Sequence, residues 1–306
     1  MEETLSSPTV SMKLQSMAQQ AKDYPAMVFN NVLHLIDQAF LLEAYHQTQK
    51  SSAPGVDQVT ATQYADNLDD NLRDLHERLR DQRYVAPPVE RVWIEKAGGK
   101  KRPIGQPCFA DKIVQRAVVR LLEALFAQDF QAFSHGLRKG HSPHQALHEL
   151  REQCRTVSIN WIVDADVSGC FDNLAWSPLR AFRPQRVNEG RILCLIGQWL
   201  HAGVLEAGVL THPDQGTPQG GVVSPMLANV FLPQVLDEWF VKDVQPRMQG
   251  RCFLTRFADD VIIGCVLATD ARRVMEGLPK RFARFRLTIH PEKTALMAFK
   301  RPPSRG

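Results

Sequence analysis

The sequence lacks the marks of several protein classes. No run of about eighteen apolar residues is present, so neither a membrane-spanning helix nor a membrane partner is expected. The N-terminal stretch MEETLSSPTVSMKLQ lacks the apolar core of a signal peptide. The 6 cysteines are scattered without a Cys-x-x-Cys pair, which indicates neither a zinc site nor a disulfide framework and fits a reducing cytoplasm. We therefore expect a cytoplasmic protein.

The chain also has little excess of charge, with a net +4 over 306 residues. Its composition, 44% hydrophobic and 23% charged, allows one large globular domain or two to three lobes. The basic residues are concentrated in two places, with 7 Lys and Arg against 2 acids in residues 95–120 and 8 against 1 in residues 278–306. Such zones could line one nucleic-acid groove, or they could be solvated faces.

Apolar spacing and turn residues predict helices and strands in mixed order. Residues 89–105 alternate and break at Gly98-Gly99, which predicts a hairpin. Residues 159–167 alternate as a strand, with apolar residues on one face and Asp164 and Asp166 on the other. An amphipathic helix is predicted by an apolar stripe of leucines, Leu68, Leu72, Leu75 and Leu79. Interleaved strands and helices predict an α+β fold.

Three further helix starts are predicted by polar residues and proline. Asp111 is expected to cap a long amphipathic helix. Pro143 suits the first turn of another helix, because its missing N–H would be unpaired there anyway. A third helix is expected to begin near Ser224 and to run to Phe240.

The dipeptide Asp259-Asp260 lies between two predicted strands, residues 252–257 and 261–266. Two adjacent like charges among apolar residues are costly to bury. Asp is a common turn residue, so a solvated hairpin turn is one interpretation. The other is a cation site: if the strand that ends at Asp166 lies beside this hairpin, three carboxylates meet at one sheet edge. Such a cluster would hold two divalent cations for phosphoryl transfer, with Mg²⁺ the preferred ion.

Several motifs, in order and spacing, resemble the bacterial group II intron reverse transcriptases, also called intron-encoded maturases. The resemblance covers nearly the whole chain from about Asp23, and Phe257 stands where that family commonly has Tyr. The matching stretches are APGVDQVT (53–60), GKKRPIGQP (99–107), DKIVQRAV (111–118), DVSGCFD (166–172), GTPQGG (216–221), FADD (257–260) and HPEKT (290–294).

The resemblance implies the fingers and palm of a right-hand polymerase, with the palm a ferredoxin-like antiparallel sheet that has helices on one face. It implies an RNA-directed DNA polymerase, in which a primer 3′-hydroxyl attacks the α-phosphate of a dNTP on an RNA template. Group II intron RNA is an implied partner, and no oligomeric state is predicted. The implied domains are an N-terminal helical extension (1–50), fingers (51–158), palm (159–299) and a linker stub (300–306), with thumb and endonuclease domains expected to be absent.

The resemblance also implies which residues would do the chemistry. Asp166, Asp259 and Asp260 would ligate two Mg²⁺ ions, with Mn²⁺ as a substitute and Asp260 as the looser ligand. Asp164 shares the strand face of Asp166 and is a rival, but only Asp166 is followed five positions later by an aromatic residue, Phe171. Phe171 would exclude a 2′-hydroxyl from the sugar site, or it is a core aromatic residue.

The remaining implied residues contact the nucleotide or the nucleic acid. Lys96 and Arg102 would grip the triphosphate, and Lys293 would approach the pyrophosphate as a proton donor. Gln219 would contact the nucleotide or the template. Close approach of the backbone to nucleic acid would use Gly216, Gly220 and Gly221, and template phosphates would meet Arg138 and Lys139.

The sequence departs from the family at two internal places and at its end. Ala175-Trp176 replaces a common Asp-His pair, and His135-Gly-Leu137 stands where many members have Tyr-Gly-Phe. The chain stops shortly after HPEKT, before a thumb would begin. Two alternatives therefore stay open: a truncated, weakly active or inactive intron RNA-binding relic, and a domesticated reverse transcriptase in phage defence.

Overall fold

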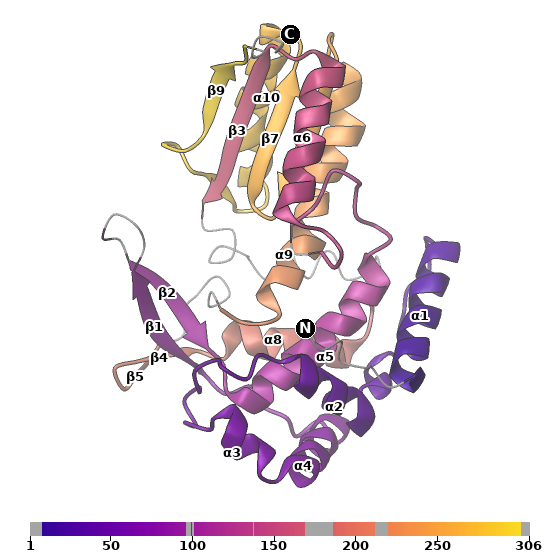
Figure 1. Ribbon diagram of the computed structural model, residues 1–306, viewed down its shortest axis with the longest axis vertical. Coiled ribbons are helices and arrows are strands. Elements are labelled where there is room, and N and C mark those ends of the chain that lie inside the picture. Colours follow the sequence, from indigo (N-terminus) through magenta and orange to yellow (C-terminus); the bar gives the residue numbers. More distant parts are fainter. Residues whose placement is uncertain are drawn as a thin grey trace. The chain divides into compact units, whose positions relative to one another are not determined.

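A computed structural model describes residues 8–95, 99, 101–136, 138–168, 186–211 and 220–300 (Figure 1). The predicted α+β class is confirmed. The chain divides into two compact units, each formed from two stretches: Met1–Gln128 with Leu179–Met226, and Asp129–Pro178 with Leu227–Gly306. These units divide the chain at other residues than the predicted fingers and palm, whose assignment stays a prediction. Among the described residues, no helix is long and apolar enough to cross a membrane.

The first unit is mainly helical and carries one small sheet with strand order β2-β1-β4-β5. Its helical elements are α1 (Pro8–Asp23), η1 (Leu33–Leu35), α2 (Gln38–Gln47), α3 (Ala61–Ala65), α4 (Leu68–Arg80), α5 (Phe109–Phe126) and α8 (Gly190–His201). Its strands are β1 (Val89–Glu95), β2 (Lys101–Gln106), β4 (Val204–Glu206) and β5 (Val209–Thr211). The sequence pattern did not predict β4 and β5, because strands this short show no measurable alternation.

Two elements of the first unit match their predictions. Leu72, Leu75 and Leu79 are buried on one side of α4, as the leucine stripe predicts. β1 and β2 form the predicted antiparallel hairpin. Gly99, in its connection, has a φ of +75°, a conformation that glycine adopts without a steric penalty.

The prediction that Asp111 caps a helix is wrong. α5 begins at Phe109, and its N-cap residue Cys108 makes no side-chain capping bond. Asp111 lies within the first turn, and its side chain is buried. The local preference of aspartate for caps was overridden by tertiary donors.

Asp111 is instead the centre of a buried hydrogen-bond network. Its carboxylate accepts hydrogen bonds from Trp199 Nε1 (2.7 Å), Gln115 Nε2 (2.7 Å) and the Tyr84 hydroxyl. Gln115 Oε1 accepts in turn from the backbone N–H of Val223 (3.2 Å). The network therefore ties α5 and α8 to the segment that leads into the next helix. Burial raises the pKa of Asp111 to about 6 in spite of these donors.

We expect this raised pKa to make stability fall as pH rises. The folded-state pKa of about 6 lies above the ordinary value of 3.8, so the stabilising contribution is complete below pH 3.8 and is lost as pH rises through 6. At roughly 1.4 kcal/mol per pKa unit, the difference corresponds to about 3 kcal/mol. Urea unfolding from pH 4 to pH 7 should show this loss in the wild type and not in Asp111→Asn. The substitution Asp69→Asn, at an exposed carboxylate of α4, should keep the wild-type pH dependence. An unchanged dependence in Asp111→Asn would contradict the assignment.

The second unit contains an antiparallel sheet in which β3 is a shared partner (Figure 1). β6 pairs with β7 and β7 with β3, while β8 and β9 both pair with β3. Its strands are β3 (Trp161–Ser168), β6 (Cys252–Phe257), β7 (Asp260–Cys265), β8 (Thr288–Ile289) and β9 (Ala295–Ala298). Its helices include α6 (Pro143–Val157) and α10 (Ala268–Ala283). β9 was not predicted.

One long helical stretch leads into the second unit. α9 (Ser224–Leu232) is followed by two π-helical segments, η2 (Pro233–Asp237) and η3 (Phe240–Val244), and a 3-10 turn, η4 (Gln245–Arg247). The predicted start at Ser224 is confirmed, but after Leu232 the chain changes from α-helical to π-helical conformation. The predicted helix at Pro143 is also confirmed, with Ser142 in a capping box.

The two faces of the β3–β7 pair differ in burial. Val163 and Ala165 lie opposite Ile263 and Val261, and all four side chains are buried. The other face carries Asp164 and the residues that share its parity, which are only partly buried. The alternation predicted for residues 159–167 is therefore confirmed, and one face of the sheet stays open for polar residues.

Candidate active site

Asp259 lies in a tight turn between β6 and β7. Phe257 pairs with Asp260 across the hairpin, so Ala258 and Asp259 form a two-residue connection. Ala258 has a φ of +55°, which is uncommon for a residue other than glycine and needs support from the surrounding structure. The predicted hairpin turn is thus present, and it presents two successive carboxylates at one end of the sheet.

A third carboxylate lies beside this turn on the neighbouring strand. Asp166 of β3 is directly opposite Asp260 of β7 in the antiparallel register. Directly opposed residues in such a pair have Cβ atoms about 4.5–5.5 Å apart. Two sequence segments that are far apart in the chain therefore bring Asp166 and Asp260 together, with Asp259 next in the turn.

Burial and neighbouring carboxylates raise the pKa values of Asp260 and Asp164. Burial raises the pKa of Asp260, and the negative charges of Asp259, Asp166 and Asp164 raise it further, while Lys293 opposes them. The pKa of Asp164 is also raised, by burial and then by Asp166. Accumulated negative charge of this kind favours the binding of a cation.

The segment HPEKT (290–294) contacts the end of β3 at Asp166. The backbone N–H of His290 donates to the Asp166 carbonyl (2.8 Å), and Thr294 Oγ1 accepts from the Asp166 N–H (3.4 Å). The Lys293 ammonium forms an ion pair with the Asp166 carboxylate, and this contact raises the pKa of Lys293. The side chain of Lys293 is 61% exposed, so the lysine can leave this position without disturbing the core.

The donor set of this cluster fits a hard divalent cation, because carboxylate oxygens are the ligands that such ions prefer. Burial and then the neighbouring negative charges raise the pKa of Asp260, and a bound cation would relieve the repulsion between those charges. Among the residues that the structure describes, no group of three or more His, Cys, Asp or Glu side chains is arranged so that it could hold a metal ion by itself.

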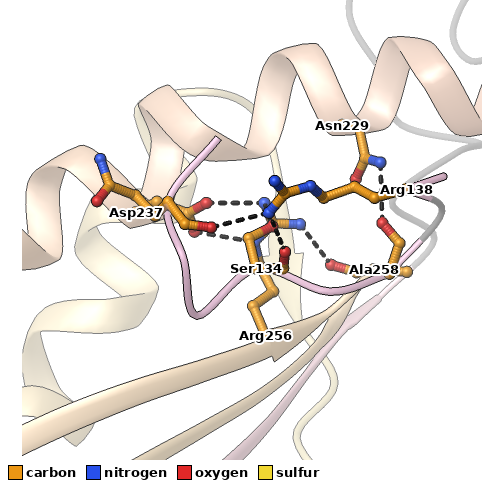
Figure 2. Close-up of polar contacts among 8 residues, drawn as sticks. Ser134, Arg138, Asn229, Asp237, Arg256 and Ala258 are labelled. Atoms are coloured by element: carbon orange, nitrogen blue, oxygen red, sulfur yellow. Dashed lines mark hydrogen bonds and ion pairs between the residues drawn. The ribbon is translucent and has the colours of Figure 1, made fainter. Parts of the chain in front are cut away.

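A buried polar network lies beneath the turn and was not predicted from the sequence (Figure 2). Arg256, the last residue before Phe257, is entirely buried. Its guanidinium donates to Asp237, to Ser134 and to the Ala258 carbonyl. A basic residue beside FADD in an otherwise apolar strand was the available sequence signal.

Three more of the predicted residues are described, each within its own unit. Gly220 has a φ of +114°, and a Cβ there would lie 2.5 Å from the Gly105 carbonyl oxygen, so the backbone at Gly220 closely approaches β2. Arg138 donates to the Gln131 carbonyl (2.9 Å) and lies over the Phe130 ring. Lys139 is exposed.

The other predicted residues can be placed only in part. Gly221 lies just before α9. The backbone of Arg102 lies in β2 opposite Ile94. The residues outside the described part of the chain are Lys96, Phe171, Gly216 and Gln219.

Comparison with known families decides what kind of protein carries this arrangement. Residues 94–303 match the family described as reverse transcriptase (RNA-dependent DNA polymerase). The chain belongs to the reverse transcriptase family. The match includes all three carboxylates, Lys293 and the Arg256 network. Members of this family generally use divalent metal ions.

Three curated proteins illustrate what the chain is similar to. It is 33% identical over 230 residues to Protein YkfC of Escherichia coli K12, across 73% of this chain and 60% of the relative. It is 34% identical over 188 residues to the group II intron-encoded protein LtrA of Lactococcus lactis, across 61% and 31%. It is 34% identical over 242 residues to an uncharacterised 91 kDa protein in the cob intron of Schizosaccharomyces pombe, across 76% and 29%. The chain therefore spans between about a third and three fifths of these relatives.

Proposed function

We propose that the chain is an RNA-directed DNA polymerase of the group II intron type. The observation that carries the proposal is the direct pairing of Asp166 with Asp260 on the open sheet face, with Asp259 in the adjoining turn. Membership of the reverse transcriptase family supports the same reaction. Residues 51–158 would then be the fingers and residues 159–299 the palm.

In this reaction the three carboxylates would hold two Mg²⁺ ions, with Mn²⁺ as a substitute. When bound, such ions activate the attacking oxygen and stabilise the leaving oxygen of an in-line displacement. Asp166 and Asp259 would be the main ligands and Asp260 the looser one. Mg²⁺ usually completes its shell with substrate phosphates and waters, so the dNTP would supply part of the coordination. The primer 3′-hydroxyl displaces pyrophosphate from the α-phosphate of the dNTP.

The remaining predicted residues would orient the substrates. Lys96 and Arg102 would hold the triphosphate, with Arg offering a fork of donors and Lys a compact charge. Phe171 would exclude a 2′-hydroxyl by its bulk, and Gln219 would contact the nucleotide or template. Lys139, exposed in the structure, would contact template phosphates, as would Arg138 if it left its internal partners.

We propose RNA template, DNA primer and dNTPs as substrates, and group II intron RNA as the partner, so that the activity would serve intron mobility and splicing. The similarity to a group II intron-encoded protein supports this partner. Exposed basic residues such as Lys101 and Lys139 would supply charge for a phosphate backbone.

Primer extension on poly(rA)/oligo(dT) tests the proposed reaction. With Mg²⁺ present we expect incorporation of dTTP, poor incorporation of UTP, and loss of incorporation when EDTA removes the metal. A signal that persists unchanged in EDTA, or no dTTP incorporation by the folded chain at any Mg²⁺ or Mn²⁺ concentration, would contradict the proposal.

The Lys293–Asp166 ion pair leads to a prediction about metal dependence. Lys293→Met removes the ammonium that pairs with Asp166, so we expect less Mg²⁺ to be needed for half-maximal rate. We also expect the maximal rate to fall by about 10²-fold, since a positioned proton donor commonly contributes that much or more. A Mg²⁺ titration of primer extension at saturating dTTP measures both changes.

The exposed Lys280 of α10 provides the control for this prediction. Lys280→Met removes the same charge and should leave both the Mg²⁺ requirement and the maximal rate unchanged. If Lys293→Met behaves like Lys280→Met, Lys293 has neither of the two proposed roles.

A further inference from the structure

Arg256 and Asp237 form a buried ion pair next to the Ala258–Asp259 turn. Arg256 Nε donates to Asp237 Oδ1 at 2.8 Å and Arg256 Nη2 to Asp237 Oδ2 at 2.7 Å, so the pair is bidentate. Both side chains are 0% exposed. Removing two charges from water is costly, and well-packed apolar residues often stabilise a core as well as or better than such a pair. Stability alone therefore does not explain this pair.

The guanidinium makes two further contacts, and one of them reaches the turn. Arg256 Nη2 donates to Ser134 Oγ at 2.6 Å, and Nη1 donates to the Ala258 carbonyl at 3.0 Å. That carbonyl belongs to the peptide bond that joins Ala258 to Asp259. Figure 2 shows Asp237, Ser134 and Ala258 around the same guanidinium. Arg256 therefore holds the backbone of the turn that carries Asp259, one of the proposed metal ligands.

The opposite side of the turn is fixed by a second backbone segment. The His135 N–H donates to the Arg256 carbonyl (2.9 Å), and the Arg256 N–H donates to the Phe133 carbonyl (2.9 Å). Asn229 Nδ2 donates to the Gly136 carbonyl at 2.9 Å. Gly136 passes so close to the turn that a Cβ on it would lie 2.0 Å from the Ala258 nitrogen.

The turn has a conformation that needs this support. Ala258 has a φ of +55°, in a region that residues other than glycine rarely occupy. Such conformations persist where the surrounding structure over-determines them. Asp237 comes from the π-helical segment η2, a kind of helix that is often found at functional sites.

We propose that the Arg256–Asp237 pair is a positioning device that holds the Ala258–Asp259 peptide, and through it sets the metal-binding geometry of Asp259 and Asp260. The inference rests on the proposed polymerase function for its catalytic consequence. Its structural part, the fixing of the turn, does not depend on activity. Arg is suited to this task because its planar fork can bind a carboxylate and two further acceptors at once.

A double substitution separates positioning from stability. Arg256→Met alone would leave the Asp237 charge buried and unpaired, which would destabilise the whole unit. Arg256→Met combined with Asp237→Leu removes both charges and keeps the volume filled, so the unfolding midpoint should stay near that of the wild type. The Ala258 carbonyl nevertheless loses its donor. Arg256→Lys, which keeps the charge but lacks the fork, is the second variant.

Two measurements then report on the turn. We expect faster amide hydrogen exchange at residues 257–260 in the double variant, with unchanged exchange at residues 261–265. We also expect the Mg²⁺ concentration for half-maximal primer extension to rise by about 10–100-fold, the usual effect of losing a residue that orients a metal ligand. Arg256→Lys should change both quantities in the same direction.

Arg281 supplies a matched control. It donates to the Val235 and Gln234 carbonyls, both at 2.8 Å, and so holds the same π-helical segment without contacting the turn. Arg281→Met should lower the unfolding midpoint and leave the Mg²⁺ requirement unchanged.

The possible failures can be told apart. If the double variant exchanges like the wild type at residues 257–260, or needs no more Mg²⁺, the pair serves stability alone and the positioning role is wrong. If the wild type extends no primer, the polymerase proposal fails, while hydrogen exchange still decides whether the pair fixes the turn.

Discussion

Asp259→Asn is expected to lower the rate of primer extension by on the order of 10³-fold. Divalent ions contribute several kcal/mol of transition-state stabilisation in phosphoryl transfer, and each 1.36 kcal/mol is about a tenfold change in rate. Asparagine keeps the size of the side chain and the turn, so the fold should be retained while the negative charge is lost. Single-turnover primer extension with Mg²⁺, together with a circular dichroism spectrum, measures both expectations.

Asp164→Asn is the matched control for this substitution. Asp164 lies on the same face of β3 as Asp166, and its pKa is raised by burial and then by the charge of Asp166. It pairs with Ile262, away from the turn. Its substitution should therefore reduce the rate far less. If Asp164→Asn and Asp259→Asn lower the rate of primer extension equally, the effect comes from the total negative charge of the cluster and not from metal ligation by Asp259.

Gly136→Ala is expected to disturb the same turn from the other side. The added Cβ would lie 2.0 Å from the Ala258 nitrogen and 2.7 Å from its Cα, distances that real contacts do not allow. Backbone must therefore move, at a cost of roughly 1–3 kcal/mol in the free energy of unfolding. A shift of about 1 Å in a reacting geometry can lower the rate about 10²-fold, so primer extension should fall by that order. Urea unfolding and primer extension measure the two effects.

Gly140 allows the steric clash to be separated from backbone strain. It lies in the same connection and has a φ of +78°, but nothing lies within 4 Å of a Cβ built there. Gly140→Ala should cost about 1–2 kcal/mol through its backbone conformation and leave the catalytic rate nearly unchanged. If both alanine variants copy RNA at the wild-type rate, contact between Gly136 and the turn has no catalytic importance.

The local elements of the site could be predicted from the sequence. Residues 159–167 alternate because one face of β3 packs into the core, and this burial imposes a period of two. The apolar runs on both sides of Asp259 predict two strands for the same reason. Their register was beyond prediction, since the pairing of Asp166 with Asp260 joins segments that meet only in the folded chain.

The buried charges could not be predicted in this way. Arg256 has the same sequence appearance as a strand arginine that points to solvent, and only the folded structure shows its side chain fully buried. Its partner Asp237 lies at the end of a π-helical segment, and the extra residue in each π turn alters the face on which a side chain lies. The periodicity of an ordinary helix therefore gives no basis for pairing them.

Asp111 shows how a correct local preference can give the wrong residue role. Aspartate is common at helix N-termini, but α5 starts at Phe109 and leaves Asp111 inside the first turn. Donors from Tyr84 and Trp199, which are distant in the sequence, decide its role instead. The pH dependence expected from Asp111 consequently comes from tertiary structure.

The central expectation is that Asp166, Asp259 and Asp260 together hold two divalent cations. Anomalous diffraction from crystals of the chain with Mn²⁺, template–primer and a dNTP measures this most directly, because it locates the ions without an activity assay. We expect two anomalous peaks about 3.5–4 Å apart beside these carboxylates. Mn²⁺ bound elsewhere, with no peak beside the carboxylates in crystals that contain the dNTP, would contradict the proposed site.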